Sequence, residues 1–339
     1  MGLNALMNGL GTVLFFSTVF LITRRYEAAE RTFGFPSYGY IGAGILIGGQ
    51  ALAIAGVVPV ATYFTAIAWT GYILWADAAV FAMNGRSLLR TYPQEFAWLA
   101  VFSIPLWLIF EAYNLSLENW IYIGLPSNVV ARMIGYLWAF ATIWPGIFET
   151  AALLGGLGIH QSRPAERDEG MTTKLQPAMS PQRPGRATRT IQLMSIIIGA
   201  VLLIAPVLMP AQIRPYLFGA VWLGFIFFLE PINYRIGAES LWRDLEQGRR
   251  SRLAALLMAG AVCGIFWEFW NYSALARWVY VFPMFQNYRI FAMPALGYLG
   301  FPPFALECFA MFAFVAHVAN RILAKMGMAA RFRPEALDL

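Results

Sequence analysis

The sequence predicts an all-α fold: a polytopic integral membrane helical bundle of about nine transmembrane helices, built as two parallel four-helix repeats plus one extra N-terminal helix. Three observations predict it. The chain of 339 residues is 59% hydrophobic and only 12% charged, whereas a soluble domain carries about twice that share of charged residues. Its apolar runs are long and lack strict alternation, which favours helices over a barrel. A pattern of motifs also occurs twice.

Nine apolar segments have the length of ~20 residues that a helix needs to cross a bilayer. They span residues 3–23, 37–57, 60–83, 95–116, 130–157, 191–210, 214–235, 252–274 and 291–324. The first has no basic residue before it and Arg24 and Arg25 after it, the reverse of a cleavable signal peptide. We therefore expect an uncleaved first span with its N-terminus outside.

With this orientation, the basic clusters between spans all fall on the inner side, as the positive-inside rule requires. They include Arg86 and Arg90, the 158–190 loop, and Lys325 in the tail. We expect a multi-pass protein of the cell inner membrane, with the C-terminus and the 158–190 loop in the cytoplasm. These loops also account for the net charge of +6, so no nucleic-acid partner is expected.

The duplication keeps residue type, order and spacing over many positions. The first copy reads Trp69, Gly71, Asp77, Ser87, Leu88, Arg90, Glu111, Asn114, Trp120, Tyr122, Pro145 and Glu149. The second reads Trp222, Gly224, Glu230, Ser240, Leu241, Arg243, Glu268, Asn271, Trp278, Tyr280, Pro303 and Glu307. Four spans, an even number, separate equivalent helices, so the copies are predicted to be parallel and related by an axis near the membrane normal.

Five regions follow from this pattern. Residues 1–35 form the N-terminal transmembrane helix and its cytoplasmic connection, 36–157 the first repeat, 191–325 the second repeat, and 326–339 a cytoplasmic tail. Residues 158–190 between the repeats are polar and proline-rich, so they cannot bury a core and are predicted to be a disordered cytoplasmic linker.

Two glutamates lie deep inside predicted spans, each four residues after a proline: Glu149 after Pro145 and Glu307 after Pro303. A buried acid costs roughly 2.5–3.5 kcal/mol on insertion scales, and a proline removes a helix hydrogen bond. A broken helix at membrane depth is tolerated where protein packs around it or where it lines a cavity. Glu307 is therefore the leading candidate catalytic residue, and Glu149 the next.

The pairs Glu111–Asn114 and Glu268–Asn271 each place a carboxyl and an amide on one helix face. Two interpretations remain open: a polar clamp between helices, or a site in which Glu111 and Glu268 act as acids or bases and Asn114 and Asn271 hold a ligand oxygen.

Aromatic residues surround these pairs. Trp120 and Tyr122 follow the fourth span, and Trp278 and Tyr280 follow the eighth. They form either a headgroup-level belt or a lid over an internal cavity. The candidate substrate-binding residues are Asn271, Asn114, Trp278, Tyr280, Trp267 and Trp270, and the second copy is expected to be the active one.

Asp77 and Glu230 lie toward the inner ends of their spans, near Arg86 and Arg235 respectively. The spacing predicts interfacial ion pairs that close the cytoplasmic side. Other chemistries lack support: Cys263 and Cys308 have no CxxC neighbour, and P-loop, GxSxG and HExxH motifs are absent from the sequence. The sequence thus indicates no cofactor and no metal.

The segments Trp120-Ile-Tyr122 … Pro145-Gly-Ile-Phe-Glu149 and Trp278-Val-Tyr280 … Pro303-Phe-Ala-Leu-Glu307 resemble the small membrane-bound lycopene cyclase domain, which also occurs as two subunits or a tandem fusion. At the position of that family's second glutamate, the two copies here have Thr150 and Cys308. The resemblance implies acid-initiated, non-redox cyclisation of carotenoid ends, with Glu307 or Glu149 protonating an alkene or stabilising the resulting cation.

Three classes of function remain open. The protein is an intramembrane enzyme that modifies an isoprenoid or another lipid, a proton-coupled carrier of a lipid or small molecule, or a non-catalytic subunit of a membrane complex. The expected partners are accordingly a membrane lipid or isoprenoid ligand and, in the third case, other membrane proteins. The enzyme hypothesis predicts a pocket between the copies, lined by aromatic residues around Glu307 or Glu149, and the subunit hypothesis predicts no central cavity.

Overall fold

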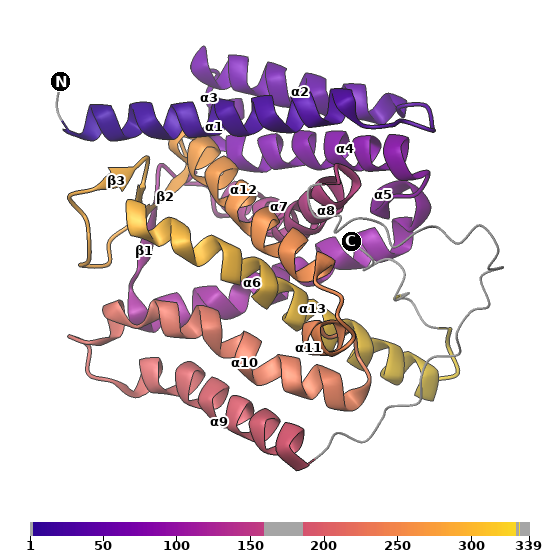
Figure 1. The fold of residues 1–339 in the computed structure, drawn as a ribbon. Helices are drawn as coiled ribbons and strands as arrows, with labels where there is room; N and C mark the ends of the chain where they lie inside the picture. Colours follow the sequence, from indigo (N-terminus) through magenta and orange to yellow (C-terminus); the bar gives the residue numbers. More distant parts are fainter. Residues whose placement is uncertain (1–2, 159–185, 330–331, 333–339) are drawn as a thin grey trace.

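The computed structural model describes residues 3–158, 186–329 and 332, and it is an almost entirely helical bundle (Figure 1). The N-terminal helix is α1 (Leu3–Ala28). The elements that follow, here called the first half, are α2 (Ser37–Ile54), α3 (Val58–Thr62), α4 (Phe64–Asn84), α5 (Leu88–Thr91), α6 (Pro93–Leu117), β1 (Trp120–Ile123), α7 (Val129–Ala141) and α8 (Ile143–Gly156). The second half comprises α9 (Arg186–Leu208), η1 (Arg214–Tyr216), α10 (Phe218–Ile236), α11 (Leu241–Glu246), α12 (Ser251–Ser273), β2 (Arg277–Tyr280), β3 (Arg289–Ile290), β4 (Met293–Pro294), η2 (Ala295–Gly300) and α13 (Phe301–Lys325).

The described residues contain eight helical segments that are long and apolar enough to cross a membrane, which supports the prediction of a helical membrane protein. Eight of the nine predicted spans coincide with these segments. The ninth, 214–235, coincides with η1 and α10, whose last two turns carry Glu230, Asn233 and Arg235. Because of these polar residues near its end, α10 is not one of the eight segments.

The helices form layers (Figure 1). Helices α1 and α2 lie along one edge of the bundle and α9 along the opposite edge, while α4, α8, α12 and α13 are the most deeply buried. The outer helices expose Leu, Ile, Val and Phe side chains, which costs nothing where lipid tails surround the helix. The two halves interlock at the centre, where the indole of Trp144 donates a hydrogen bond to the carbonyl of Cys308 at 2.8 Å.

The predicted helix breaks are present, but they lie before the prolines. The predicted span 130–157 divides into α7 and α8 at Thr142, three residues before Pro145. The Ser103 hydroxyl donates to the Phe140 carbonyl and accepts from the Trp144 N–H at 3.2 Å, so it stabilises both sides of the break. Because Pro145 has no backbone N–H to donate, one helical hydrogen bond to the preceding turn is missing, and the break lies in that turn.

In the second half, the predicted span 291–324 begins differently. Residues 289–294 form the short β3–β4 hairpin, residues 295–300 a 3-10 turn, and the regular helix starts at Phe301. Pro302 and Pro303 then occupy the first turn of α13, where no helical hydrogen bond is lost. Glu307 is therefore inside a continuous helix, as the seventh residue of α13.

Most of the predicted linker and part of the predicted tail, residues 159–185, 330–331 and 333–339, lie outside the described residues. The prediction is wrong at one end of the linker, because residues 186–190 belong to helix α9. Helix α9 thus continues from the apolar stretch back into the end of this polar segment.

Candidate functional site

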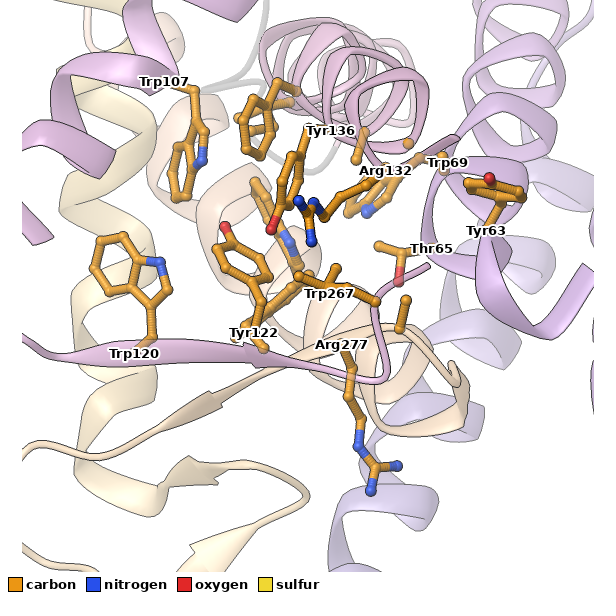
Figure 2. A pocket seen from close by; sticks show the side chains of 18 of the residues that line it. Tyr63, Thr65, Trp69, Trp107, Trp120, Tyr122, Arg132, Tyr136, Trp267 and Arg277 are labelled. Atoms are coloured by element: carbon orange, nitrogen blue, oxygen red, sulfur yellow. The ribbon is translucent and has the colours of Figure 1, made fainter. Parts of the chain in front are cut away.

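A pocket with mostly aromatic walls lies where the two halves meet (Figure 2). Its lining side chains come from helices of both halves and from strands β1 and β2. The space free of protein atoms, including the open mouth, is about 1140 Å³. Figure 2 shows the rings of Trp107, Trp120, Tyr122 and Tyr136 facing a common open centre. Ligand pockets usually have such apolar and aromatic walls.

The pocket is covered by a lid, the two-stranded ribbon of β1 and β2. The strands are antiparallel, with Trp120 opposite Tyr280 and Tyr122 opposite Trp278. Because side chains alternate along a strand, each W-x-Y segment places both rings on one face, and all four rings line the pocket. Ile121 between them is 50% exposed. Of the two interpretations of these aromatic residues, the geometry corresponds to a lid.

Each strand of the lid is held by an asparagine of the preceding helix. The Asn114 amide donates to the Trp120 carbonyl at 2.9 Å, and its oxygen accepts from the N–H groups of Asn119 and Trp120 at 2.8 and 3.1 Å. Asn271 likewise donates to the Trp278 carbonyl at 2.9 Å and accepts from the Trp278 N–H at 3.0 Å. Neither asparagine lines the pocket. The structure therefore places Asn114 and Asn271 as clamps on the lid rather than as ligand-binding residues.

Glu111, one turn before Asn114, holds the aromatic rings of the lid in place. One carboxyl oxygen, Oε1, accepts from the Tyr122 hydroxyl at 2.5 Å, the Trp107 indole at 2.9 Å and the Trp120 indole at 3.3 Å. All three donors line the pocket, whereas the carboxyl itself stands behind them. Glu111 therefore contacts the pocket only through these three donors.

Glu268 repeats this arrangement in the second half. Its Oε1 accepts from the Tyr280 hydroxyl at 2.9 Å, and the Trp278 indole donates to that hydroxyl at 2.9 Å. Its Oε2 is buried without a partner. Burial, reinforced by the neighbouring carboxyl, raises the pKa of the Tyr122 and Tyr280 phenols well above its ordinary value. Both phenols therefore stay protonated and act as donors.

Glu149 and Glu307, the leading candidates for catalysis, do not line the pocket. Both are 0% exposed, and neither carboxyl has a hydrogen-bond partner among the described residues. Glu149 lies close enough to Asp77 for the two carboxyls to interact electrostatically. The structure therefore places both glutamates inside the bundle, away from the aromatic pocket.

Asp77 stabilises the first turn of the short helix α5. It accepts from the Ser87 hydroxyl at 2.9 Å and the Leu89 N–H at 2.7 Å, and also from the Tyr38 hydroxyl. The expected ion pair with Arg86 is wrong: hydroxyls and a backbone N–H satisfy the carboxylate, as at other helix N-termini.

Glu230 does the same for α11. It accepts from the Ser240 hydroxyl at 2.9 Å and the Trp242 N–H at 3.1 Å. Arg235, the expected partner, instead donates to Gln192 at 2.9 Å. The repeated serine ten residues after each acid, noted as a motif, is thus explained by this cap.

The two remaining substrate-binding candidates, Trp267 and Trp270, lie in different surroundings. Trp267 lines the pocket. Trp270 is 1% exposed and packs edge-on against Trp69, with ring centroids 4.9 Å apart, so it belongs to the core rather than to the pocket wall.

Sequence reasoning did not select Arg132 and Thr65, which line the pocket together with Trp69 (Figure 2). A signal existed for Arg132, because it is the only basic residue in the predicted span 130–157 and ionisable residues within spans mark functional sites. Thr65 carried no such signal.

Within the described residues, no group of three or more His, Cys, Asp or Glu side chains could hold a metal ion. No protein-family model, curated protein or solved structure matches this chain.

Proposed function

We propose that this protein binds a lipid-like molecule, such as an isoprenoid, in the aromatic pocket between its two halves. The observation that carries the proposal is the pocket itself, which lies where the two halves meet and has walls built mainly from Trp, Tyr and Phe rings. A pocket with such walls favours a largely apolar ligand. It also favours ligand binding over a purely structural subunit role, for which no central cavity is expected.

The two halves are, in this proposal, parallel four-helix repeats related by a two-fold axis near the membrane normal. The register of the lid supports this, because Ile121 lies opposite Val279 and the pairs on either side are related by exchange of the strands. Equivalent positions of both halves also line the pocket: Trp69 and Trp222, Trp120 and Trp278, and Tyr122 and Tyr280. The duplication would then have built one site shared by both copies.

We place the N-terminus and the lid outside and the C-terminus in the cytoplasm of an inner membrane, with α10 as the ninth span. Figure 1 shows the lid at one end of the bundle and α5 and α11 at the other. Arg86, Arg90, Arg243 and Arg249 lie at or beside α5 and α11, which supports a cytoplasmic position for that end.

Filling the pocket with a larger side chain tests this proposal. Ala139 lines it on α7, and Ala112 on α6 is exposed. We expect organic extracts of the purified protein to contain a stoichiometric lipid-like molecule by mass spectrometry in the wild type and in Ala112→Trp, and to lose it in Ala139→Trp. Ala139→Phe provides a milder filling if Ala139→Trp lowers the unfolding temperature. Identical extracts from all folded variants would overturn the proposal.

A second candidate function is acid–base catalysis on the bound molecule, in the manner of the lycopene cyclase domain that the sequence resembles. The observation that favours it is the presence of two Tyr–Glu pairs, Tyr122–Glu111 and Tyr280–Glu268, whose phenols line the pocket. Such an isomerase adds a proton to an alkene and removes one from the resulting carbocation, without redox change. Because Glu149 and Glu307 lie away from the pocket, the proposed acid and base are Glu111 and Glu268.

Expression in bacteria that accumulate lycopene tests the catalytic candidate. We expect carotenoids with cyclised ends by chromatography and mass spectrometry, and loss of the product in the double variant Glu111→Gln/Glu268→Gln at equal protein level. Unchanged lycopene in the presence of well-folded wild-type protein would overturn cyclisation and leave the binding proposal standing.

A further inference from the structure

We infer that the molecule bound in the pocket carries an anionic head group, a carboxylate or a phosphate, which is held by Arg132, Thr65 and Trp69. This inference deepens the proposed function and rests on it. It starts from the unequal distribution of polar groups around the pocket wall.

Arg132 supplies a positive charge that lacks a counter-ion. It is half-buried, lines the pocket, and extends from α7 into the open centre (Figure 2). Among the described residues, no carboxylate lies within ion-pair distance of its guanidinium. The other lining arginine, Arg277, is turned away: it donates to the Tyr272 carbonyl at 3.1 Å. Since no acidic side chain lines the pocket, Arg132 is the charged side chain that faces its centre.

The position of Arg132 in its helix adds to this charge. It is the fourth residue of α7, a helix of 13 residues whose N-terminus is capped by the Asn128 side chain. The N-terminal end of a helix carries a partial positive charge, so a cation is unfavourable there unless an anion neutralises it. A ligand with a negative head group would neutralise both charges.

Thr65 and Trp69 provide two further donors that lack acceptors. They are 8% and 3% exposed, and neither the Thr65 hydroxyl nor the Trp69 indole N–H has a hydrogen-bond partner in the part of the chain that the structure describes. They are four residues apart on α4, hence on the same helix face. An indole N–H can only donate. A buried donor without an acceptor is unfavourable, and an oxyanion would accept from both donors.

The remaining wall is suited to an apolar chain. The second half contributes Phe218, Trp222, Phe301 and Phe304 to the pocket, and none of these side chains offers a charge. The polar group of the ligand is therefore directed toward α4 and α7, and its apolar part toward α10 and α13. The ligand class is an anionic amphiphile rather than a neutral hydrocarbon.

Three probes with the same chain test the inference: oleate, oleyl phosphate and oleyl alcohol, titrated by calorimetry into purified protein in a neutral detergent. We expect at least one of the two anionic probes to bind the wild type tenfold or more tightly than the alcohol. In Arg132→Gln this preference disappears, and in Arg132→Lys part of it remains. Thr65→Val and Trp69→Phe reduce the preference several-fold.

The matched control is Arg214→Gln. Arg214 is another arginine outside the predicted inner connections, and its side chain donates to the Met209 carbonyl instead of lining the pocket. It should keep the full preference, and unfolding temperatures of all variants show whether they are folded. Equal binding of the alcohol and both anions by the wild type, or a preference that survives in Arg132→Gln, would overturn the inference. Failure of all three probes to bind would overturn it too, and the extraction of Ala139→Trp decides separately whether the pocket binds any ligand.

Discussion

The two halves stabilise an interrupted helix in different ways. In the first half, Ser103 on α6 bonds both sides of the break between α7 and α8. The matched position, 157 residues later, is Gly260 on α12. A Cβ added there would lie 2.3 Å from the carbonyl oxygen of Phe301, so the start of α13 packs directly on the α12 backbone. The break is thus common to both halves, whereas the residue that stabilises it is not.

The halves also differ in what they offer to the pocket. Thr65 of the first half corresponds to Phe218 in the second, which also lines the pocket, whereas Arg132 corresponds to Ile290, which does not line it. The lid strands, in contrast, are held by an asparagine in both halves. The sequence analysis expected the second half to be the active one, but the polar groups within the pocket come mainly from the first.

The largest effect should come from the lid clamps and should differ between the halves. Asn114→Ala removes three hydrogen bonds and Asn271→Ala removes two. At ~1 kcal/mol each, the free energy of unfolding should fall by about 3 and about 2 kcal/mol respectively. Reversible unfolding in mixed detergent micelles measures both. Asn84→Ala, at an exposed position, should be nearly neutral, and equal losses at Asn114 and Asn271 would show that the two clamps are equivalent.

Gly260→Ala should have the next largest effect. The added methyl group meets the backbone of Phe301 and Pro302 rather than the end of a flexible side chain, and overpacking of this kind costs about 2 kcal/mol. The same unfolding assay applies. Gly44→Ala on α2, where nothing lies within 4 Å of the added atom, is the matched control. A stability of Gly260→Ala equal to that of the control would mean that the two halves do not differ at this position in the way described.

The smallest effect concerns the lid tyrosines and pH. The folded pKa of Tyr122 and Tyr280 is raised by burial, so the folded state keeps phenol protons that the unfolded chain releases near pH 10. Stability is then present below about pH 10 and lost as the pH rises above it. The double variant Tyr122→Phe/Tyr280→Phe should lose less stability between pH 9 and pH 11 than the wild type, measured by unfolding temperature. A parallel decline in both proteins would contradict this.

Several local features of the site could be predicted from sequence. The spacing Glu-x-x-Asn places both side chains on one helix face, and W-x-Y places both rings on one face of a strand. Both placements are correct, but Asn114 and Asn271 neither join two helices nor line the pocket: each bonds the backbone of the strand that follows its own helix. Pro145 correctly indicated a break, although the break lies at Thr142. Local geometry alone determines such features.

Glu149 and Glu307 were the leading catalytic candidates, but neither lines the pocket. Their burial was predicted correctly, because an acid in an apolar segment is conspicuous in any sequence. Whether a buried acid lines a cavity depends on which helices pack against it, and neither does. Arg132 shows the converse: its charge within a span was a signal in the sequence, but that it lines a pocket appears only when α7 is placed beside α4 and the lid.

The sequence by itself determined that this chain is a helical membrane protein, where its helices are interrupted, and which side chains share a face, because hydropathy, proline and helical periodicity act over short distances along the chain. The tertiary structure decided that β1 pairs with β2, in which Ile121 lies opposite Val279, 158 residues later in the chain. It also decided that a pocket lies beneath these strands and that the polar wall of the pocket comes from the first half. These features depend on contacts between distant segments, and no local pattern specifies which partner a face will meet.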